Sequence, residues 1–322
     1  DVFVHDTSTA STTRVSVDSA GNQALAVGPA SSSLPTISGD GRFTAFVTAA
    51  ANAVTGDLNS ATDVFVRDNA TGVLSAVSVD PAGATGDGPS SAPSLSGIGT
   101  RVAFVSSATD LVPGDTNGVA DVFVRDQSSG VTTRVSIDSA GSQVTGGSSV
   151  PSISGDGNHV AFVSTSSDLV AGDTNGVADV FVHDTVTGAT TRVSVDGAGT
   201  QASAASSAPA MSADGRFVAF ESSASDLVAD DTNGVADVFL HDTATGATTR
   251  VSVDSAGNQA DAPAVADLLS AAPAVSGDGR LVAFASGASN LVAGDSNGLR
   301  DVFVLSLIHI SEPTRLWSGS RM

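Results

Sequence analysis

Short apolar blocks recur along the chain and are separated by stretches rich in Gly, Asp, Asn and Ser. In the unit that begins at Asp121, residues 122–124 are apolar throughout, which is typical of a strand buried on both faces. Residues 132–137 alternate apolar and small polar side chains, as a strand with one exposed face does. Two further blocks, at residues 150–153 and 159–163, flank a Gly-Asp-Gly turn and predict a hairpin. The pattern therefore predicts four short antiparallel strands per unit.

The same unit returns about every 58 residues, and each full copy opens on Asp-Val-Phe-[Val/Leu]-[His/Arg]-Asp. Such self-similarity is typical of a unit that buries its apolar faces only by stacking against its copies. Four short strands, with tight turns alternating with long loops, predict a β-propeller blade. A parallel β-solenoid is the alternative, although its rungs are usually about half as long as this unit. The five copies and the start of a sixth begin at Asp1, Asp63, Asp121, Asp179, Asp237 and Asp301.

Residues 1–304 are therefore predicted to form one all-β domain, a β-propeller with four complete four-stranded antiparallel blades and two partial ones. Most of the phenylalanines occupy equivalent positions in two strands of each unit, which predicts that they pack between blades. These residues are Phe3, Phe46, Phe65, Phe104, Phe123, Phe162, Phe181, Phe220, Phe239, Phe284 and Phe303.

Residues 305–322 match no repeat and are predicted to be a non-native tail. Within them, residues 305–315 resemble, residue by residue, the conceptual translation of a transposase adapter used in DNA sequencing libraries. The only tryptophan of the chain, Trp317, also lies in this segment. The alternative is a genuine C-terminal tail. Because Asp1 already lies inside a repeat, we expect the chain to be cut at both ends.

Acidic residues outnumber basic ones by 34 to 13, which gives a formal net charge of -21. This charge disfavours a nucleic acid as partner, because phosphate backbones are bound by basic surfaces, and it favours cations as small ligands. The chain contains no cysteine, so disulfides and thiolate metal sites are excluded. No apolar run reaches the roughly 18 residues that a membrane-spanning helix needs, so no span is predicted.

Several short segments of one unit resemble the TolB-type propeller repeat. They are Ile153-Ser-Gly-Asp-Gly157, Val160-Ala-Phe-Val-Ser164, Asp179-Val-Phe-Val-His-Asp184 and Thr187-Gly188. The resemblance covers residues 1–304 and implies four-stranded blades, a periplasmic or extracellular location and association with other proteins. The same blade also occurs in enzymes. The long loop before each Asp-Val-Phe block departs from the usual repeat, which has a shorter turn there.

This long loop carries the pattern Asp-Xaa-Asn-Gly-Xaa-Xaa-Asp, with Ser60 in place of Gly in one copy. Closely spaced Asp and Asn oxygens can satisfy the coordination of calcium, so calcium is the predicted cofactor. The alternative is that Asn-Gly forms a turn and the aspartates cap it. The predicted ligands are Asp57, Asn59, Asp63, Asp115, Asn117, Asp121, Asp173, Asn175, Asp179, Asp231, Asn233, Asp237, Asp295, Asn297 and Asp301.

Three histidines, His5, His183 and His241, each precede an aspartate in the opening block. Arg67 and Arg125 hold the same position in sister units, so these side chains are interpreted as structural. A catalytic group is expected to be singular and to have a nucleophile or base beside it. No catalytic residue is predicted.

Glu221 breaks the repeat, because a small or apolar residue stands at its position elsewhere. It is interpreted as an acid at an exposed strand edge. The predicted function is a non-catalytic propeller scaffold that binds a protein or a glycan. The alternative function is a propeller-fold enzyme, such as a polysaccharide lyase or hydrolase, since a fold by itself does not determine chemistry.

Overall fold

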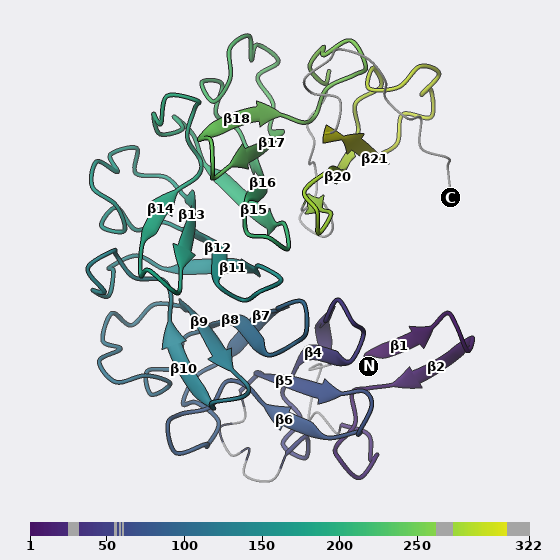
Figure 1. Cartoon of the computed structure of the whole chain (residues 1–322), viewed down its shortest axis with the longest axis vertical. Helices are drawn as coiled ribbons and strands as arrows, with labels where there is room; N and C mark the ends of the chain where they lie inside the picture. Colours follow the sequence, from purple (N-terminus) through teal and green to yellow (C-terminus); the bar gives the residue numbers. More distant parts are fainter. Residues whose placement is uncertain (25–31, 55–56, 58, 60, 262–272, 308–322) are drawn as a thin grey trace.

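The computed structural model of the chain describes all residues except 25–31, 55–56, 58, 60, 262–272 and 308–322. The described residues form 21 β-strands in six antiparallel sheets. In this part of the chain, no helix is long and apolar enough to cross a membrane. The sheets follow one another around an arc, with the first and the last sheet at its two ends (Figure 1).

Four sheets have four strands each, hydrogen-bonded in chain order. The first contains β3 (Ser33–Ile37), β4 (Phe43–Thr48), β5 (Asp63–Asp68) and β6 (Leu74–Ala76). The second contains β7 (Ser90–Leu95), β8 (Arg101–Ser106), β9 (Asp121–Asp126) and β10 (Val131–Arg134). The third contains β11 (Ser148–Ile153), β12 (His159–Ser164), β13 (Asp179–Asp184) and β14 (Thr190–Arg192). The fourth contains β15 (Ser206–Met211), β16 (Phe217–Ser222), β17 (Asp237–Asp242) and β18 (Ala247–Arg250).

The two terminal sheets have fewer strands among the described residues. The N-terminal sheet pairs β1 (Phe3–Asp6) with β2 (Ser11–Arg14). The C-terminal sheet contains β19 (Ala274–Val275), β20 (Leu281–Ser286) and β21 (Asp301–Ser306). The predicted all-β propeller, with four complete and two partial blades, is confirmed. Antiparallel pairing throughout rules out the parallel solenoid. Of the predicted tail, residues 308–322 lie outside the described part of the chain.

The blades are displaced by half a unit from the sequence repeat. The unit that starts at Asp121 contributes β9 and β10 to the end of one blade, and β11 and β12 to the start of the next. The predicted hairpin is confirmed, since β11 pairs with β12 in an antiparallel register. The first strands of the blades, such as β7, β11 and β15, lie toward the inside of the arc, and the fourth strands β10 and β14 lie toward the outside (Figure 1).

Cross-strand pairs of phenylalanines occupy the spaces between blades. Phe162 on β12 lies opposite Phe181 on β13, with ring centroids 6.0 Å apart, and both side chains are fully buried. Their core cluster includes Val105 and Val122 of the preceding blade, which confirms the predicted packing between blades at this position. The prediction is wrong for Phe3, which is 55% exposed because it lies in the N-terminal sheet at the end of the arc. The equivalent pairs are Phe46 and Phe65, Phe104 and Phe123, Phe220 and Phe239, and Phe284 and Phe303.

A backbone ladder joins successive blades at the turn after each first strand. The N–H of Gly97 donates to the carbonyl oxygen of Gly155 at 2.8 Å, and the N–H of Gly155 donates to that of Ala213 at 2.8 Å. A Cβ atom on Gly155 would lie 2.9 Å from the Cβ of Ala213 and 3.0 Å from its carbonyl oxygen. Glycine therefore permits the close approach of the two turns.

Candidate cation-binding loops

Two kinds of long loop lie on the same face, because the strands alternate in direction. One kind joins the second and third strands of a blade, as the loop from β8 to β9 with Asp115 and Asn117 does, and the other joins successive blades, as from β10 to β11. The two loops touch, since the Asn117 amide donates a 3.0 Å hydrogen bond to the carbonyl oxygen of Val144. The predicted ligands therefore lie on the long-loop face, and the Gly-Asp-Gly turns lie on the opposite face.

The last aspartate of each pattern begins the third strand of its blade. Asp121 is fully buried, and its Oδ1 accepts a 2.6 Å hydrogen bond from the hydroxyl of Ser136. The same serine oxygen accepts a 3.0 Å hydrogen bond from the N–H of Val122. This aspartate therefore joins the loop to the end of the outer strand. Equivalent serine–aspartate pairs are Ser78 with Asp63, Ser194 with Asp179, and Ser252 with Asp237.

The asparagine of each pattern closes the loop on itself. Besides its bond to Val144, the Asn117 amide donates to Asp121 Oδ2 at 3.1 Å, and its Oδ1 accepts from the N–H of Val119 at 3.1 Å. The predicted Asn-turn is therefore present, and it is tied to the final aspartate. The same three hydrogen bonds recur at Asn59, Asn175 and Asn233.

An arginine from the outer strand lies against both aspartates in three of the loops. Arg134 Nη1 lies 3.3 Å from Asp115 Oδ1 and 3.6 Å from Asp121 Oδ2, and its side chain is only 10% exposed. Gln143 Nε2 donates a 2.7 Å hydrogen bond to the same Asp115 Oδ1. Burial raises the pKa of Asp115, while Gln143 and Arg134 act in the opposite direction. The same ion pairs join Arg192 to Asp173 and Asp179, and Arg250 to Asp231 and Asp237.

Sequence reasoning missed these arginines. A signal was present, because Thr-Thr-Arg recurs in the outer strand of a chain that has only 13 basic residues. In the sequence, however, Arg134 is far from Asp115. Only the antiparallel pairing of β9 with β10, which sets Arg134 opposite Phe123, brings the guanidinium over the loop.

The loop that contains Asp57, Asn59 and Asp63 differs from these three. Ala76 stands opposite Phe65, the position that Arg134 occupies in the next blade, so no arginine reaches this loop from its outer strand. Asp57 is 4% exposed, and its Oδ1 is buried without a hydrogen-bond partner among the described residues. Burial raises the pKa of Asp63 to about 6, and the charges of Asp57 and Asp110 add to this effect.

The loop that precedes β21 is more open. Asn297 Nδ2 donates a 3.2 Å hydrogen bond to Asp301 Oδ2, and Asn297 Oδ1 accepts a 2.8 Å hydrogen bond from the N–H of Leu299. Asp295 and Asp301 are half-buried. The turn chemistry of the pattern is thus the same in this terminal sheet.

The calcium sites remain a prediction. Within the described ranges, no group of three or more His, Cys, Asp or Glu side chains gathers in a way that could hold a metal ion. Each loop contributes two carboxylates and one amide, so a bound ion would need further oxygens from the backbone, hydroxyl groups or water. Among the described residues, the three loops with an arginine and the two loops without one therefore present different electrostatic environments to a cation.

The histidines of the opening blocks bond to the neighbouring outer strand. His183 Nδ1 lies 2.9 Å from Thr190 Oγ1, and that hydroxyl donates a 2.6 Å hydrogen bond to the carbonyl oxygen of Ile137 in the preceding blade. Because the hydroxyl proton is used in this way, Nδ1 carries the proton of the neutral ring. Burial lowers the pKa of His183. The same chain of contacts runs from His241 through Thr248 to Val195.

Glu221 is buried, so its interpretation as an acid at an exposed strand edge is wrong. It lies on β16, the second strand of its blade, between Ser207 and Val238 of the adjacent strands. Its side chain is 8% exposed, and Oε1 has no hydrogen-bond partner among the described residues. Burial raises the pKa of Glu221 to about 7, and the charge of Arg300 lowers it in part.

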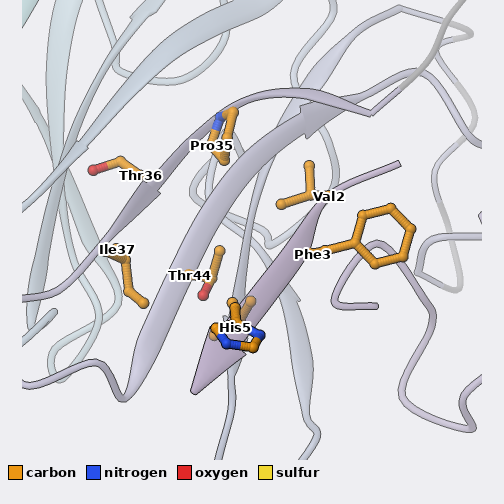
Figure 2. Close-up of a pocket in the computed structure, with 8 residues that line it drawn as sticks. Val2, Phe3, His5, Pro35, Thr36, Ile37 and Thr44 are labelled. Atoms are coloured by element: carbon orange, nitrogen blue, oxygen red, sulfur yellow. The ribbon is translucent and has the colours of Figure 1, made fainter. Parts of the chain in front are cut away.

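An open hollow of about 480 Å³ lies between the N-terminal sheet and the first complete blade. Figure 2 shows His5 beside Thr44 and Ile37, while the ring of Phe3 points away from them. His5 is the only titratable side chain among its lining residues, and its Nδ1 lies 2.8 Å from the hydroxyl of Thr12. This hollow offers apolar contact area but no pair of acid–base groups.

No protein-family model and no curated protein matches this chain. Among solved structures, it is similar to TolB from Acinetobacter baumannii, with a TM-score of 0.52 and 17% identity over 95% of this chain. The match covers 56% of that TolB chain, so the present chain spans little more than half of its length. The predicted TolB-like propeller is confirmed at the level of the fold.

Two oligogalacturonate lyase structures are similar to the same extent. One is a complex with manganese and the other is from Vibrio parahaemolyticus, and each has a TM-score of 0.53 and 13% identity. Each match covers 95% of this chain and 68% of the lyase. At such identities the likeness concerns the fold alone, and TolB and the two lyases share it.

Proposed function

We propose that this chain is a non-catalytic binding scaffold that presents the long-loop face of its blades to a protein or glycan ligand. The main support for the proposal is that the recurring polar side chains bond to other residues of the same chain. Asp121 bonds to Ser136, His183 to Thr190, and Arg134 pairs with Asp115, so each contributes to holding loops and blades together. Scaffolds that hold their own loops in this way leave the loop tips to make contacts with a partner.

The charge of the chain narrows the class of ligand. A net charge of -21 repels polyanions, so a neutral glycan or a basic protein surface fits better than a nucleic acid or a polyuronate. The resemblance to TolB-type repeats adds a periplasmic or extracellular location to this proposal.

Binding of the purified chain to an immobilised panel of neutral and uronic-acid glycans tests the proposed function. We expect saturable binding to a neutral glycan and none to oligogalacturonate, because the two polyanions repel each other. Adding salt separates this cause from a poor fit, since it screens charge repulsion only. Tight binding to oligogalacturonate at low salt would overturn the inferred preference for neutral or basic ligands.

A propeller-fold polysaccharide lyase is the second candidate, because the fold match to oligogalacturonate lyase is as close as that to TolB. Glu221 is the buried acid that breaks the repeat, and its raised pKa suits proton transfer near neutral pH in such chemistry. Incubation with oligogalacturonate and manganese, followed by an assay for unsaturated products, tests this candidate. Activity that the Glu221→Gln variant lacks would support the enzyme and contradict the scaffold.

Calcium stabilisation of the loops is part of the scaffold proposal. A ligand that binds only the folded chain raises its unfolding midpoint, so millimolar calcium is expected to raise the midpoint measured in chelator. An unchanged midpoint would show that the Asp and Asn residues of the loops only form and cap turns. It would not affect the proposed glycan or protein binding.

A further inference from the structure

The acidic loops of the four complete blades differ in what neutralises their two buried carboxylates. In three of them an arginine lies within ion-pair distance of both aspartates, as Arg134 does with Asp115 and Asp121. In the fourth, around Asp57 and Asp63, no ion pair with either aspartate occurs among the described residues. Two buried carboxylates without a cation are costly, because each is removed from water without compensation.

Strand register shows which residues have been exchanged. Ala76 pairs with Phe65 as Arg134 pairs with Phe123, so alanine replaces the arginine. Thr85 forms an antiparallel β-bridge with Val79, as Gln143 does with Ile137 in the next blade. Threonine therefore replaces the glutamine. The Asp57 loop therefore has short side chains at the two positions from which long side chains contact Asp115 in the sister loop.

One carboxylate oxygen of the Asp57 loop indicates which ligand takes the position that arginine holds in the sister loops. Asp115 Oδ1 contacts both Arg134 and Gln143, at 3.3 Å and 2.7 Å. In the loop without an arginine, Asp57 Oδ1 is buried without any hydrogen-bond partner in the described part of the chain. Buried carboxylate oxygens of native proteins nearly always have a partner, and an ion is one of the partners that explains an orphan.

We propose that, among the four complete blades, the loop of Asp57 and Asp63 is the calcium-binding loop, and that the arginines of the three sister loops occupy the place of the ion. The inference rests on the proposed calcium stabilisation and names the loop that provides it. Asp57 Oδ1 and the carboxylate of Asp63 are the proposed charged donors. Asn59 and Thr85, which stand at the positions of Asn117 and Gln143 in the sister loop, are the proposed sources of neutral oxygens.

The chemistry of these donors selects the class of cation. The loop offers oxygen atoms only, without nitrogen or sulfur, which favours a hard cation. Calcium tolerates irregular coordination and accepts water as a ligand, whereas magnesium requires a near-ideal octahedron. With two carboxylates, the affinity is expected in the range of extracellular calcium modules, with a Kd on the order of 0.1–1 mM.

Calorimetric titration of the full chain with calcium chloride tests the proposal, together with thermal unfolding in calcium and in chelator. We expect about one calcium ion per wild-type chain, and an increase of about 2–3 °C in the midpoint at a concentration ten times Kd. The Ala76→Arg/Thr85→Gln variant restores the side chains of the sister loops. It should lose both signals while remaining at least as stable as the wild type in chelator.

Two further variants separate charge from shape. Ala76→Met fills the same space without charge, so it tests whether a long side chain alone removes binding. Arg134→Ala opens a sister loop, and this variant is expected to bind a second calcium ion. Should it fail to fold in chelator, recovery of its folded signal by calcium chloride gives the same information.

The outcomes are distinct. Calcium binding of undiminished stoichiometry in the Ala76→Arg/Thr85→Gln variant would overturn the assignment to this loop, while leaving calcium stabilisation by another loop in place. An absence of any calcium signal in the wild type would overturn both. Loss of calcium binding in the Ala76→Arg/Thr85→Gln variant, together with an additional calcium site in Arg134→Ala, would establish that arginine and calcium occupy the same place in these loops.

Discussion

Arg134 Nη1 lies 3.3 Å from Asp115 Oδ1, and both side chains are nine-tenths buried or more. Such a pair contributes little net stability compared with apolar side chains of the same shape, but it is costly to break. The pair recurs at equivalent positions in two other blades, so the loops that follow the second strands are held closed by charge.

Arg134→Ala is therefore expected to destabilise the chain, measured in chelator, by about 3 kcal/mol, because it leaves two buried carboxylates without a cation. Arg280→Ala is the matched control. The contact between Arg280 and Asp278 is 3.8 Å long and both side chains are mostly exposed, so its loss should cost less than about 0.5 kcal/mol. Urea unfolding measures both values, and equal effects would contradict the structural role of the buried pair.

Glu221 should make the stability of the fold depend on pH. Burial raises its pKa from 4.5 to about 7 in the folded chain, so the folded state favours the protonated form. Its contribution is fully present below pH 4.5 and is lost as the pH rises through 7. Glu221→Gln should thus be more stable than the wild type at pH 8, by on the order of 2 kcal/mol, and nearly equal to it at pH 4.

The difference between the unfolding free energies of Glu221→Gln and the wild type, measured from pH 4 to 8, isolates this group. Burial also raises the pKa of Asp63 to about 6, but that contribution is present in both proteins and cancels. Glu221→Val provides a second check, because valine stands at this position in Val47, Val105 and Val163. A difference that does not change with pH would show that Glu221 is not responsible.

The equivalent phenylalanines of the repeat should differ in importance by position. Phe181 is fully buried between blades, whereas Phe3, at the same position of the N-terminal sheet, is 55% exposed. Phe181→Ala removes packing and leaves a cavity, so a loss of about 3–5 kcal/mol is expected. Phe3→Ala should cost less than about 1 kcal/mol. Chemical unfolding of the two variants, compared with the wild type, checks this contrast.

Gly155 should tolerate no side chain, because its turn touches the next blade. An alanine there would bring its Cβ within 2.9 Å of Ala213, and the backbone ladder between the turns would have to shift. We expect Gly155→Ala to cost about 1–3 kcal/mol. Gly197→Ala is the control, since nothing lies within 4 Å of the added atom. Equal melting temperatures of the two variants would contradict the close contact between blades.

Much of this molecule follows from local pattern. Residues 122–124 are apolar on both sides and lie in the buried strand β9, and the Gly-Asp-Gly turn joins β11 to β12 as predicted. Period-two alternation, glycine turns and the spacing of the units are local properties, so they can be read from residues that are near one another in the chain. They led to the propeller, to its blade number in this chain and to the packing of the phenylalanines.

The contacts that decide the chemistry are not local. A repeat can be divided at any point, so only the hydrogen-bonded partners reveal that β9 and β10 end one blade while β11 begins the next. The burial of Glu221 depends on neighbouring strands that its own sequence context does not name. Likewise, the arginine over Asp115 and its replacement by Ala76 become visible only when strands are paired in register. The sequence by itself determined the unit and its stacking, because these arise from apolar periodicity. Only the tertiary structure decided which carboxylates are neutralised, because burial and charge pairing depend on residues brought together from different strands.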